Sequence, residues 1–167
     1  KRPAPRIVDL CSGTGCIAIT LAKEIPRAKV TAVELYDGAC EYLQRNNAAF
    51  GGCISAVQGD ALVPFGEFDC VVSNPPYVAA AEMPTLQREV LAEPETSLLG
   101  GEDGLDFYRA IAKNWYDHIA SGGFIAFEIG ETQGRAVEAI LKENGYYGIS
   151  VWEDYSGLDR IVTAMKH

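Results

Sequence analysis

Apolar residues recur along the chain in two alternating patterns, namely short continuous runs and longer segments with helical spacing. Short runs are typical of buried strands in a parallel sheet, whereas apolar residues repeated every three or four positions indicate a helix. The runs predict strands at residues 6–11, 29–34, 54–58, 68–73, 124–128, 149–153 and 160–165. The helical spacing predicts helices at residues 17–25, 37–49, 105–119 and 133–144.

This alternation predicts an α/β fold, a three-layer Rossmann-like sheet of seven mostly parallel strands with helices on both faces. Only residues 154–158 separate the last two strands, and so short a link cannot make a parallel crossover. The last strand should therefore be antiparallel. In the second helix we expect Cys40, Leu43 and Ala48 to point inward. Residues 78–104 break the pattern, and irregular stretches this long are usually functional or disordered.

Composition predicts a single domain that spans residues 1–167. The chain is 48% hydrophobic and 22% charged, which allows a sizeable buried core. No run approaches the length of a membrane span, and no signal peptide opens the sequence. Because the first residue is a lysine, we expect a fragment whose N-terminal part is missing. We also expect a monomer.

The net charge limits which binding partners are plausible, and the cysteines indicate the cellular compartment. A formal charge of −9 argues against a nucleic-acid partner, since such binding depends on Lys and Arg neutralising phosphates. A protein or a small molecule fits better, and no membrane is expected. Five cysteines without a C-x-x-C pair are typical of reduced thiols in a cytoplasmic protein, so we expect no metal site.

The most distinctive stretch is Asn74-Pro75-Pro76-Tyr77, directly after an apolar run. The two prolines remove two backbone N–H donors and stiffen the chain, which leaves carbonyl oxygens without competing donors. The Asn74 side chain adds an acceptor and a donor, and Tyr77 adds an aromatic face that could wall a flat substrate. This segment, called the corner below, could hold an NH2 group between the Asn74 side-chain oxygen and the Pro75 carbonyl. Alternatively, the prolines merely end a strand and Asn74 caps a turn.

A glycine turn, Ser12-Gly13-Thr14-Gly15, joins the first strand to the first helix. Such a turn lets backbone N–H groups approach an anionic or polar ligand. It also fits the dinucleotide pattern G-x-G-x-x-A, with Glu34 placed to bind a ribose. Asp9 argues against a nicotinamide cofactor, because a carboxylate at the strand end suits an ammonium or sulfonium better than a pyrophosphate. The structural alternatives are a helix cap for Asp9, a solvated strand end for Glu34 and an Asx-turn for Asp60.

Together these residues resemble the class I methyltransferases that use S-adenosylmethionine (SAM), and among them the release-factor glutamine methyltransferases, the PrmC or HemK family. The resemblance covers nearly the whole chain. An Asn-Pro-Pro-Tyr motif is shared with nucleic-acid amino-methyltransferases, whereas the GGEDGLDFY and EIG segments are specific to this family. The motifs that carry the resemblance are Asp9 to Cys16, Glu34, Gly59-Asp60, Ser73 to Val78, Glu93-Pro94, Gly100 to Tyr108, Phe127 to Gly130 and Gly157 to Arg160.

The resemblance implies methyl transfer from SAM to the side-chain amide nitrogen (N5) of the glutamine in the Gly-Gly-Gln motif of peptide-chain release factors, with S-adenosylhomocysteine as the product. It implies three catalytic residues, Asn74, Pro75 and Tyr77, with Pro76 joining them in binding the glutamine. It also implies a set of SAM-binding residues: Asp9, Cys11, Ser12, Gly13, Thr14, Gly15, Glu34, Asp60, Ala61 and Asn74.

Two positions depart from the family pattern, and one family domain is absent. Cys11 stands where the family usually has glycine, which is tolerated if the backbone there is not at positive φ. Ala61 stands where many members carry an aromatic, so stacking on the adenine requires Phe65 or another residue. The family's helical N-terminal docking domain is not in this chain.

Two other functions remain open at this point. One is a nucleic-acid amino-methyltransferase that acts on adenine or guanine through the same corner. The other is a SAM-binding protein without turnover. The acidic charge disfavours the first, and an intact corner disfavours the second.

Overall fold

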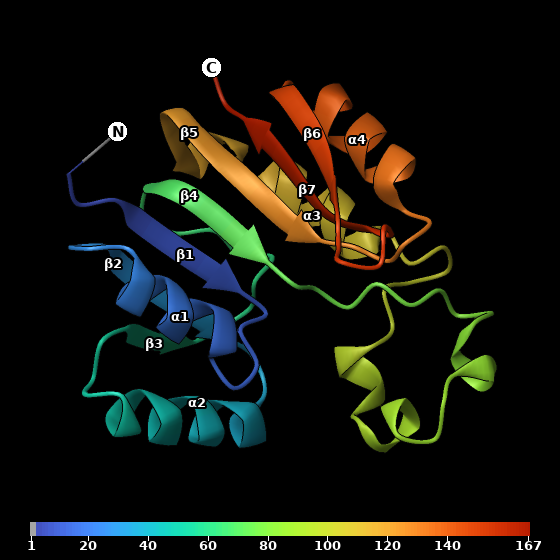
Figure 1. The fold of residues 1–167 in the computed structure, drawn as a ribbon, viewed down its shortest axis with the longest axis horizontal. Helices are drawn as coiled ribbons and strands as arrows, with labels where there is room; N and C mark the ends of the chain where they lie inside the picture. Colours follow the sequence, from blue (N-terminus) through green and yellow to red (C-terminus); the bar gives the residue numbers. More distant parts are fainter. Residues whose placement is uncertain (1–2) are drawn as a thin grey trace.

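A computed structural model describes residues 3–167 as one sheet covered by helices on both faces (Figure 1). Along the chain the strands and helices are β1 (Arg6–Leu10), α1 (Cys16–Glu24), β2 (Lys29–Glu34), α2 (Asp37–Ala49), β3 (Ser55–Gln58), β4 (Phe68–Ser73), α3 (Asp106–Asn114), β5 (Ile119–Glu128), α4 (Gly134–Glu143), β6 (Tyr147–Glu153) and β7 (Asp159–Met165). Short 3₁₀ helices lie at Met83–Thr85, Val90–Ala92, Glu95–Ser97 and Tyr116–His118.

The sheet has seven strands in the order β3-β2-β1-β4-β5-β7-β6. Strands β1 to β5 pair in parallel, and β7 pairs antiparallel with both β5 and β6. The predicted fold class and the antiparallel last strand are confirmed. The strand order reverses between β1 and β4, where ligands of open α/β sheets bind at the carboxyl ends of the strands.

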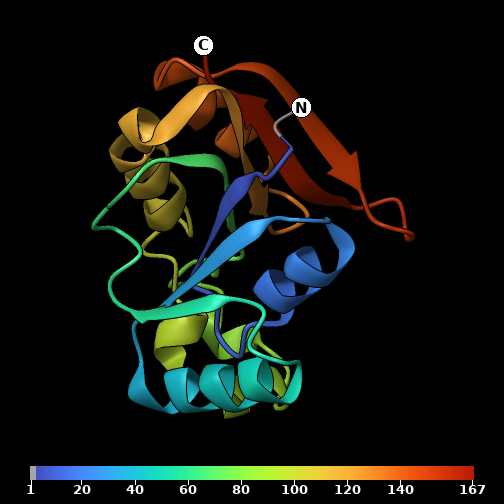
Figure 2. The ribbon, with the colours of Figure 1, turned by 90° about the vertical axis from the view of Figure 1, so that its left-hand side faces the viewer.

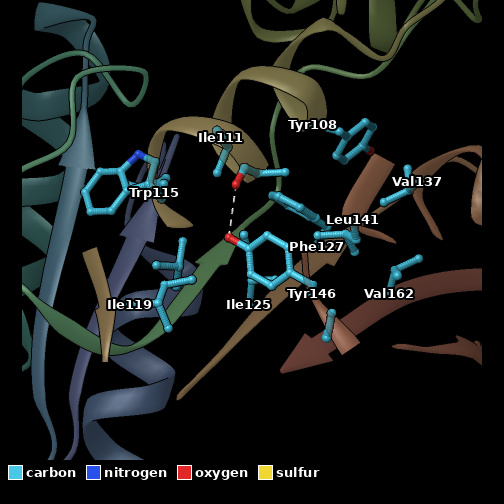
Figure 3. Close-up of a cluster of buried hydrophobic side chains, with 14 of the residues drawn as sticks. Tyr108, Ile111, Trp115, Ile119, Ile125, Phe127, Val137, Leu141, Tyr146 and Val162 are labelled. Carbon is cyan, nitrogen blue, oxygen red and sulfur yellow. Dashed lines mark hydrogen bonds between the residues drawn. The ribbon is translucent and has the colours of Figure 1, made fainter. Parts of the chain in front are cut away.

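Two hydrophobic clusters lie on opposite faces of the sheet. Consecutive strand residues point to opposite faces, so Ile7 joins the cluster beneath α1 and α2 while Val8 joins the cluster beneath α3 and α4. Figure 2 shows the sheet between these helix layers. In the larger cluster the Tyr146 hydroxyl donates to the Ala112 carbonyl at 3.1 Å, which satisfies a buried polar group (Figure 3).

Three local predictions are wrong. The helix predicted at 105–119 ends at Asn114, and β5 already begins at Ile119. The strand predicted at 124–128 begins five residues earlier, so Gly122, at φ 73°, and Gly123 lie inside β5. A Cβ on Gly123 would lie 2.6 Å from the Asp69 carbonyl oxygen, so the strands approach too closely there for a side chain. Ala48 is exposed, whereas Cys40 and Leu43 are buried as predicted.

Candidate functional site

The sequence-predicted site residues gather where β1 and β4 end side by side. A cavity of about 620 Å³ opens there, and its size is typical of a small-molecule site. Seven of the predicted residues line it: Cys11, Gly13, Glu34, Asp60, Ala61, Asn74 and Pro76. The remaining wall comes from β2 and α2 on one side and from the irregular stretch on the other: Val33, Leu35, Tyr36, Gly38, Ala39, Tyr42, Gly59, Glu93, Pro94, Thr96, Ser97 and Phe107.

The glycine turn has the backbone geometry that only glycine adopts readily. Gly13 and Gly15 have φ values of 55° and 86°. A Cβ on Gly15 would lie 2.4 Å from the Leu43 side chain, so this glycine also lets α2 pack against the start of α1. Ser12, Thr14 and Gly15 shape the turn but do not line the cavity, and the exposed Thr14 accepts a bond from the Asn46 side chain at 2.9 Å.

Glu34 closes the turn from the end of β2. Its Oε2 accepts from the Gly13 backbone N–H at 2.8 Å, and its Oε1 accepts from the N–H groups of Leu35 and Tyr36 at 2.9 and 3.0 Å. The residue is 5% exposed, so the alternative of a solvated strand end is wrong. A carboxylate has about four lone-pair sites, so Glu34 can still accept from a ligand in the cavity it lines.

Asp9 is buried beneath the turn and does not line the cavity. Its Oδ2 accepts from the Ala18 N–H in the first turn of α1 at 3.0 Å, which is the helix-capping role weighed against ligand binding. Its Oδ1 has no hydrogen-bond partner within the described chain, nor has the buried Oγ of Ser12. Burial raises the pKa of Asp9 to about 7.

Cys11 follows Asp9 by two positions and has a φ of 56°. The condition for tolerating a non-glycine residue here is therefore not met, and the left-handed backbone costs about 1–2 kcal/mol relative to glycine. Burial raises the pKa of its thiol to about 12, so the thiol stays protonated and unreactive at neutral pH.

The residues expected to bind the adenine, at Asp60 and Ala61, lie in surroundings that differ from expectation. Asp60 forms the Asx-turn named as its alternative, with Oδ1 accepting from the Leu62 N–H at 2.8 Å, yet it also lines the cavity. Phe65 does not replace an aromatic at Ala61, because its ring packs against Phe68 and Trp115 with centroids 5.6 and 5.7 Å away. The aromatic side chain that α3 contributes to the cavity wall is Phe107.

The corner is split between the cavity and the core. Asn74 is exposed and lines the cavity together with the buried Pro76. Tyr77 is half-buried and packs against the larger hydrophobic cluster rather than facing the cavity; burial raises the pKa of its hydroxyl. Within residues 3–167 neither the Asn74 side chain nor the Pro75 carbonyl has a hydrogen bond that would compete with a ligand. The Asn74 side chain is therefore available to an incoming NH2 group in the cavity, whereas Pro75 is buried and does not line the cavity.

The irregular stretch supplies cavity residues that sequence reasoning did not assign. Its 3₁₀ helices bring Glu93, Pro94, Thr96 and Ser97 to the cavity opposite α2. The stretch is anchored beside the corner, because the Val78 N–H donates to the Leu98 carbonyl and the Gly100 N–H donates to the Val78 carbonyl, both at 2.8 Å. Its unusual length was the sequence signal for a functional role.

Metal-ligand clusters and membrane-spanning helices are both missing from the described part of the chain. Among residues 3–167 no cluster of His, Cys, Asp or Glu side chains has the arrangement of a metal site. None of the helices described is both long and apolar enough to cross a bilayer.

Comparisons with known proteins agree with the geometry. The family model described as methyltransferase small domain matches residues 1–102. Release factor glutamine methyltransferase from Cereibacter sphaeroides is 42% identical over 97% of this chain and 60% of its own length. The protein of that name from Geobacter sulfurreducens is 38% identical over 95% of this chain and 57% of its own length. The chain thus spans less than two thirds of these relatives, and the likeness suggested by the motifs is confirmed.

Solved structures show the same fold at low sequence identity. A methyltransferase from Pyrococcus furiosus superposes with a TM-score of 0.76 at 20% identity, over 99% of this chain and 76% of that chain. TrmN from Thermus thermophilus superposes with a TM-score of 0.69 at 22% identity, over 99% of this chain and 45% of that chain. With the family model matching more than half of its length, the chain belongs to the methyltransferase small domain family.

Proposed function

We propose that residues 1–167 form the catalytic domain of an enzyme that transfers a methyl group from SAM to the N5 nitrogen of the glutamine in the Gly-Gly-Gln motif of peptide-chain release factors. The N5 nitrogen loses one proton as it gains the methyl group, and S-adenosylhomocysteine is the other product. The enzyme acts as a monomer in the cytoplasm, with a release factor as its protein partner. The observation that carries the proposal is the open amide of Asn74 at the rim of a small-molecule cavity, beside a Pro75 carbonyl without a donor.

The residues around the cavity fit SAM. Buried Asp9 keeps an unpaired Oδ1 under the glycine turn, and a ligand with an ammonium group supplies a donor for such an atom, directly or through water. Glu34 accepts hydrogens from hydroxyl groups such as those of a ribose. The left-handed backbone at Gly13 allows the methionine end to approach the part of the turn that lines the cavity, namely Cys11 and Gly13. When bound, SAM supplies an electrophilic methyl group on a positively charged sulfur.

Phe107 is the proposed adenine partner. The turn at Asp60 and Ala61 and the start of α3 line the same cavity, and Ala61 has no ring to stack on a base. The Phe107 ring offers an apolar face near the polar edge of Asp60, which suits a base with apolar faces and a polar rim.

The corner orients the substrate amide. An amide nitrogen is a poor nucleophile because its lone pair is delocalised into the carbonyl, so orientation matters more than early deprotonation. The Asn74 side-chain oxygen and the Pro75 carbonyl would accept the two hydrogens of the substrate NH2. These bonds strengthen as the nitrogen gains positive charge, so they stabilise the transition state more than the ground state. Such alignment can contribute about 7–11 kcal/mol.

The decisive experiment offers labelled SAM to the full-length protein with, in separate reactions, a release factor and a nucleic acid. We expect label on the release factor, and none when its Gly-Gly-Gln glutamine is replaced by glutamate, which has no NH2 to accept a methyl group. Label on nucleic acid alone would establish the amino-methyltransferase alternative and refute the proposal. SAM binding without transfer to either would indicate a binding protein.

Replacing Asn74 tests the mechanism within the same assay. Asn74→Ala removes one NH2 acceptor, so we expect kcat to fall about 100-fold, the scale for loss of one oriented catalytic hydrogen bond. The dissociation constant for SAM should change by less than about threefold, since the cofactor keeps its other contacts. Equilibrium binding and single-turnover rates separate the two effects. If SAM binding collapsed while turnover of the bound complex persisted, the assigned role would be wrong.

A further inference from the structure

Gln133, the residue before α4, connects four segments of the site through one side-chain amide. Its Oε1 accepts from the Gly130 N–H at 3.0 Å and lies 3.4 Å from the Tyr108 hydroxyl, which donates its hydrogen to the Glu128 carbonyl at 2.9 Å. Its Nε2 donates to the carbonyl oxygens of Tyr77 and Gly104 at 2.9 and 3.2 Å. The linked segments are the corner, the glycine-rich turn before α3, α3 itself and the end of β5. Figure 1 shows these segments meeting beside the start of α4.

Two hydrogen bonds hold the peptide that ends the corner: one from Gln133 to the Tyr77 carbonyl, and one from the Val78 N–H to the Leu98 carbonyl at 2.8 Å. The bond from Gln133 is the sole side-chain hydrogen bond to residues 74–77 among the described residues. The preceding prolines have no N–H groups, so they cannot donate to neighbouring segments. The orientation of the corner peptide therefore depends on β4 at one end and, at the other, on the Gln133 amide together with the bond from the Val78 N–H to the Leu98 carbonyl.

Two glycines lie close to the Gln133 amide. A Cβ on Gly104 would lie 2.3 Å from the Tyr77 carbonyl oxygen and 2.9 Å from Gln133 Nε2. A Cβ on Gly130 would lie 3.1 Å from Gln133 Oε1. Glycine thus allows the chain to approach the amide closely on both sides, where its donor end bonds to the two carbonyls.

We propose that Gln133 is a positioning residue for methyl transfer, which holds the Tyr77 carbonyl so that Asn74 and the Pro75 carbonyl face the substrate NH2 correctly. This inference rests on the proposed function. Gln133 does not line the cavity, so it acts on turnover through the corner and not on cofactor affinity. The role needs a neutral amide, because the same side chain must accept from Gly130 and donate to two carbonyls.

Two substitutions test the inference. Gln133→Glu keeps the size and the acceptor for the Gly130 N–H but places a carboxylate oxygen against two carbonyls. Gln133→Met keeps the length and neutrality but has no donor, so it carries the test if the charged variant fails to fold. We expect both to lower kcat about tenfold or more, the scale for one lost hydrogen bond, with SAM affinity within about twofold of wild type.

Controls separate this inference from the proposed function. Glu138 lies on the exposed face of α4, so Glu138→Gln should match wild type in kcat and in SAM affinity. If wild type transfers no label to a release factor, the proposed function fails. If wild type transfers label and both variants at position 133 do so equally fast, the positioning inference fails. It also fails if SAM affinity falls as much as kcat, because the residue would then be merely structural.

Discussion

At the scale of the residue, chemistry at this site depends on what surrounds each group. Glu34 and Asp9 are both carboxylates at strand ends, yet Glu34 receives three backbone N–H groups and Asp9 receives one. Burial then raises the pKa of Asp9 to about 7. The same functional group, a carboxyl, therefore serves as a rigid acceptor at Glu34 and as a group that can be neutral at Asp9.

Phe107 gives the first prediction at this scale. Phe107→Ala removes the ring that faces the cavity from α3, so we expect SAM to bind about tenfold more weakly, which corresponds to about 1.4 kcal/mol. Isothermal titration calorimetry measures the change. The matched control is Phe65→Ala, which removes a ring that packs on Phe68 and Trp115 outside the cavity. That control should lower stability and leave SAM affinity intact; equal affinity loss in both variants would argue against adenine stacking.

At the scale of the element, most boundaries followed from local pattern. The second helix begins and ends at the predicted residues, Asp37 and Ala49, and the Gly51-Gly52 pair that stops it follows after Phe50. The third helix was overextended because Trp115 and Ile119 continue its apolar spacing, although Ile119 belongs to β5. Local periodicity could not separate a buried helix end from a buried strand start, because both place the same apolar residues in the core.

The glycine-rich turn before α3 gives a prediction at this scale. In Gly100→Ala the new Cβ would lie 2.7 Å from the Pro76 carbonyl oxygen and 2.8 Å from the Tyr77 Cα, and backbone must shift to accommodate it. We expect a loss of about 1–3 kcal/mol in the free energy of unfolding and a lower kcat, because the corner moves. Thermal unfolding should show a Tm lower by about 2–12 °C.

Gly38→Ala is the matched control for that change. Gly38 lies in the first turn of α2, and a Cβ there meets no atom within 4 Å. Without ligand this variant should be as stable as wild type or slightly more stable, since alanine favours helices. If Gly100→Ala behaved like Gly38→Ala, the close contact between the turn and the corner would not constrain the site.

At the scale of the whole molecule, Asp9 couples pH to stability. Its folded pKa of about 7 exceeds the ordinary value of 3.8, so between these values the folded state holds a proton that the unfolded state has lost. The contribution of Asp9 to the free energy of unfolding is therefore greatest below about pH 4. It falls by about 1.4 kcal/mol per pH unit as pH rises to about pH 7. Above that pH both states are ionised and the penalty is constant.

Urea unfolding at several pH values checks this coupling. Asp9→Asn has no ionisable group at this position, and its side-chain oxygen can still accept from the Ala18 N–H. We expect the difference in unfolding free energy between wild type and the variant to shift by about 2–4 kcal/mol between pH 4 and pH 8, in the direction that disfavours wild type at high pH. A constant difference would mean that Asp9 ionises in the folded state as readily as it does in the unfolded chain.

Sequence by itself determined the order of strands and helices, the glycine turn and the stiff corner, because each depends on neighbours within a few positions. Only the tertiary structure decided that Phe107 faces the cavity while Phe65 does not, and that Cys11 has a left-handed backbone. It also decided that Gln133 meets Tyr77, a residue 56 positions away. Burial and contacts between distant segments arise only when the sheet assembles, so no local pattern encodes them.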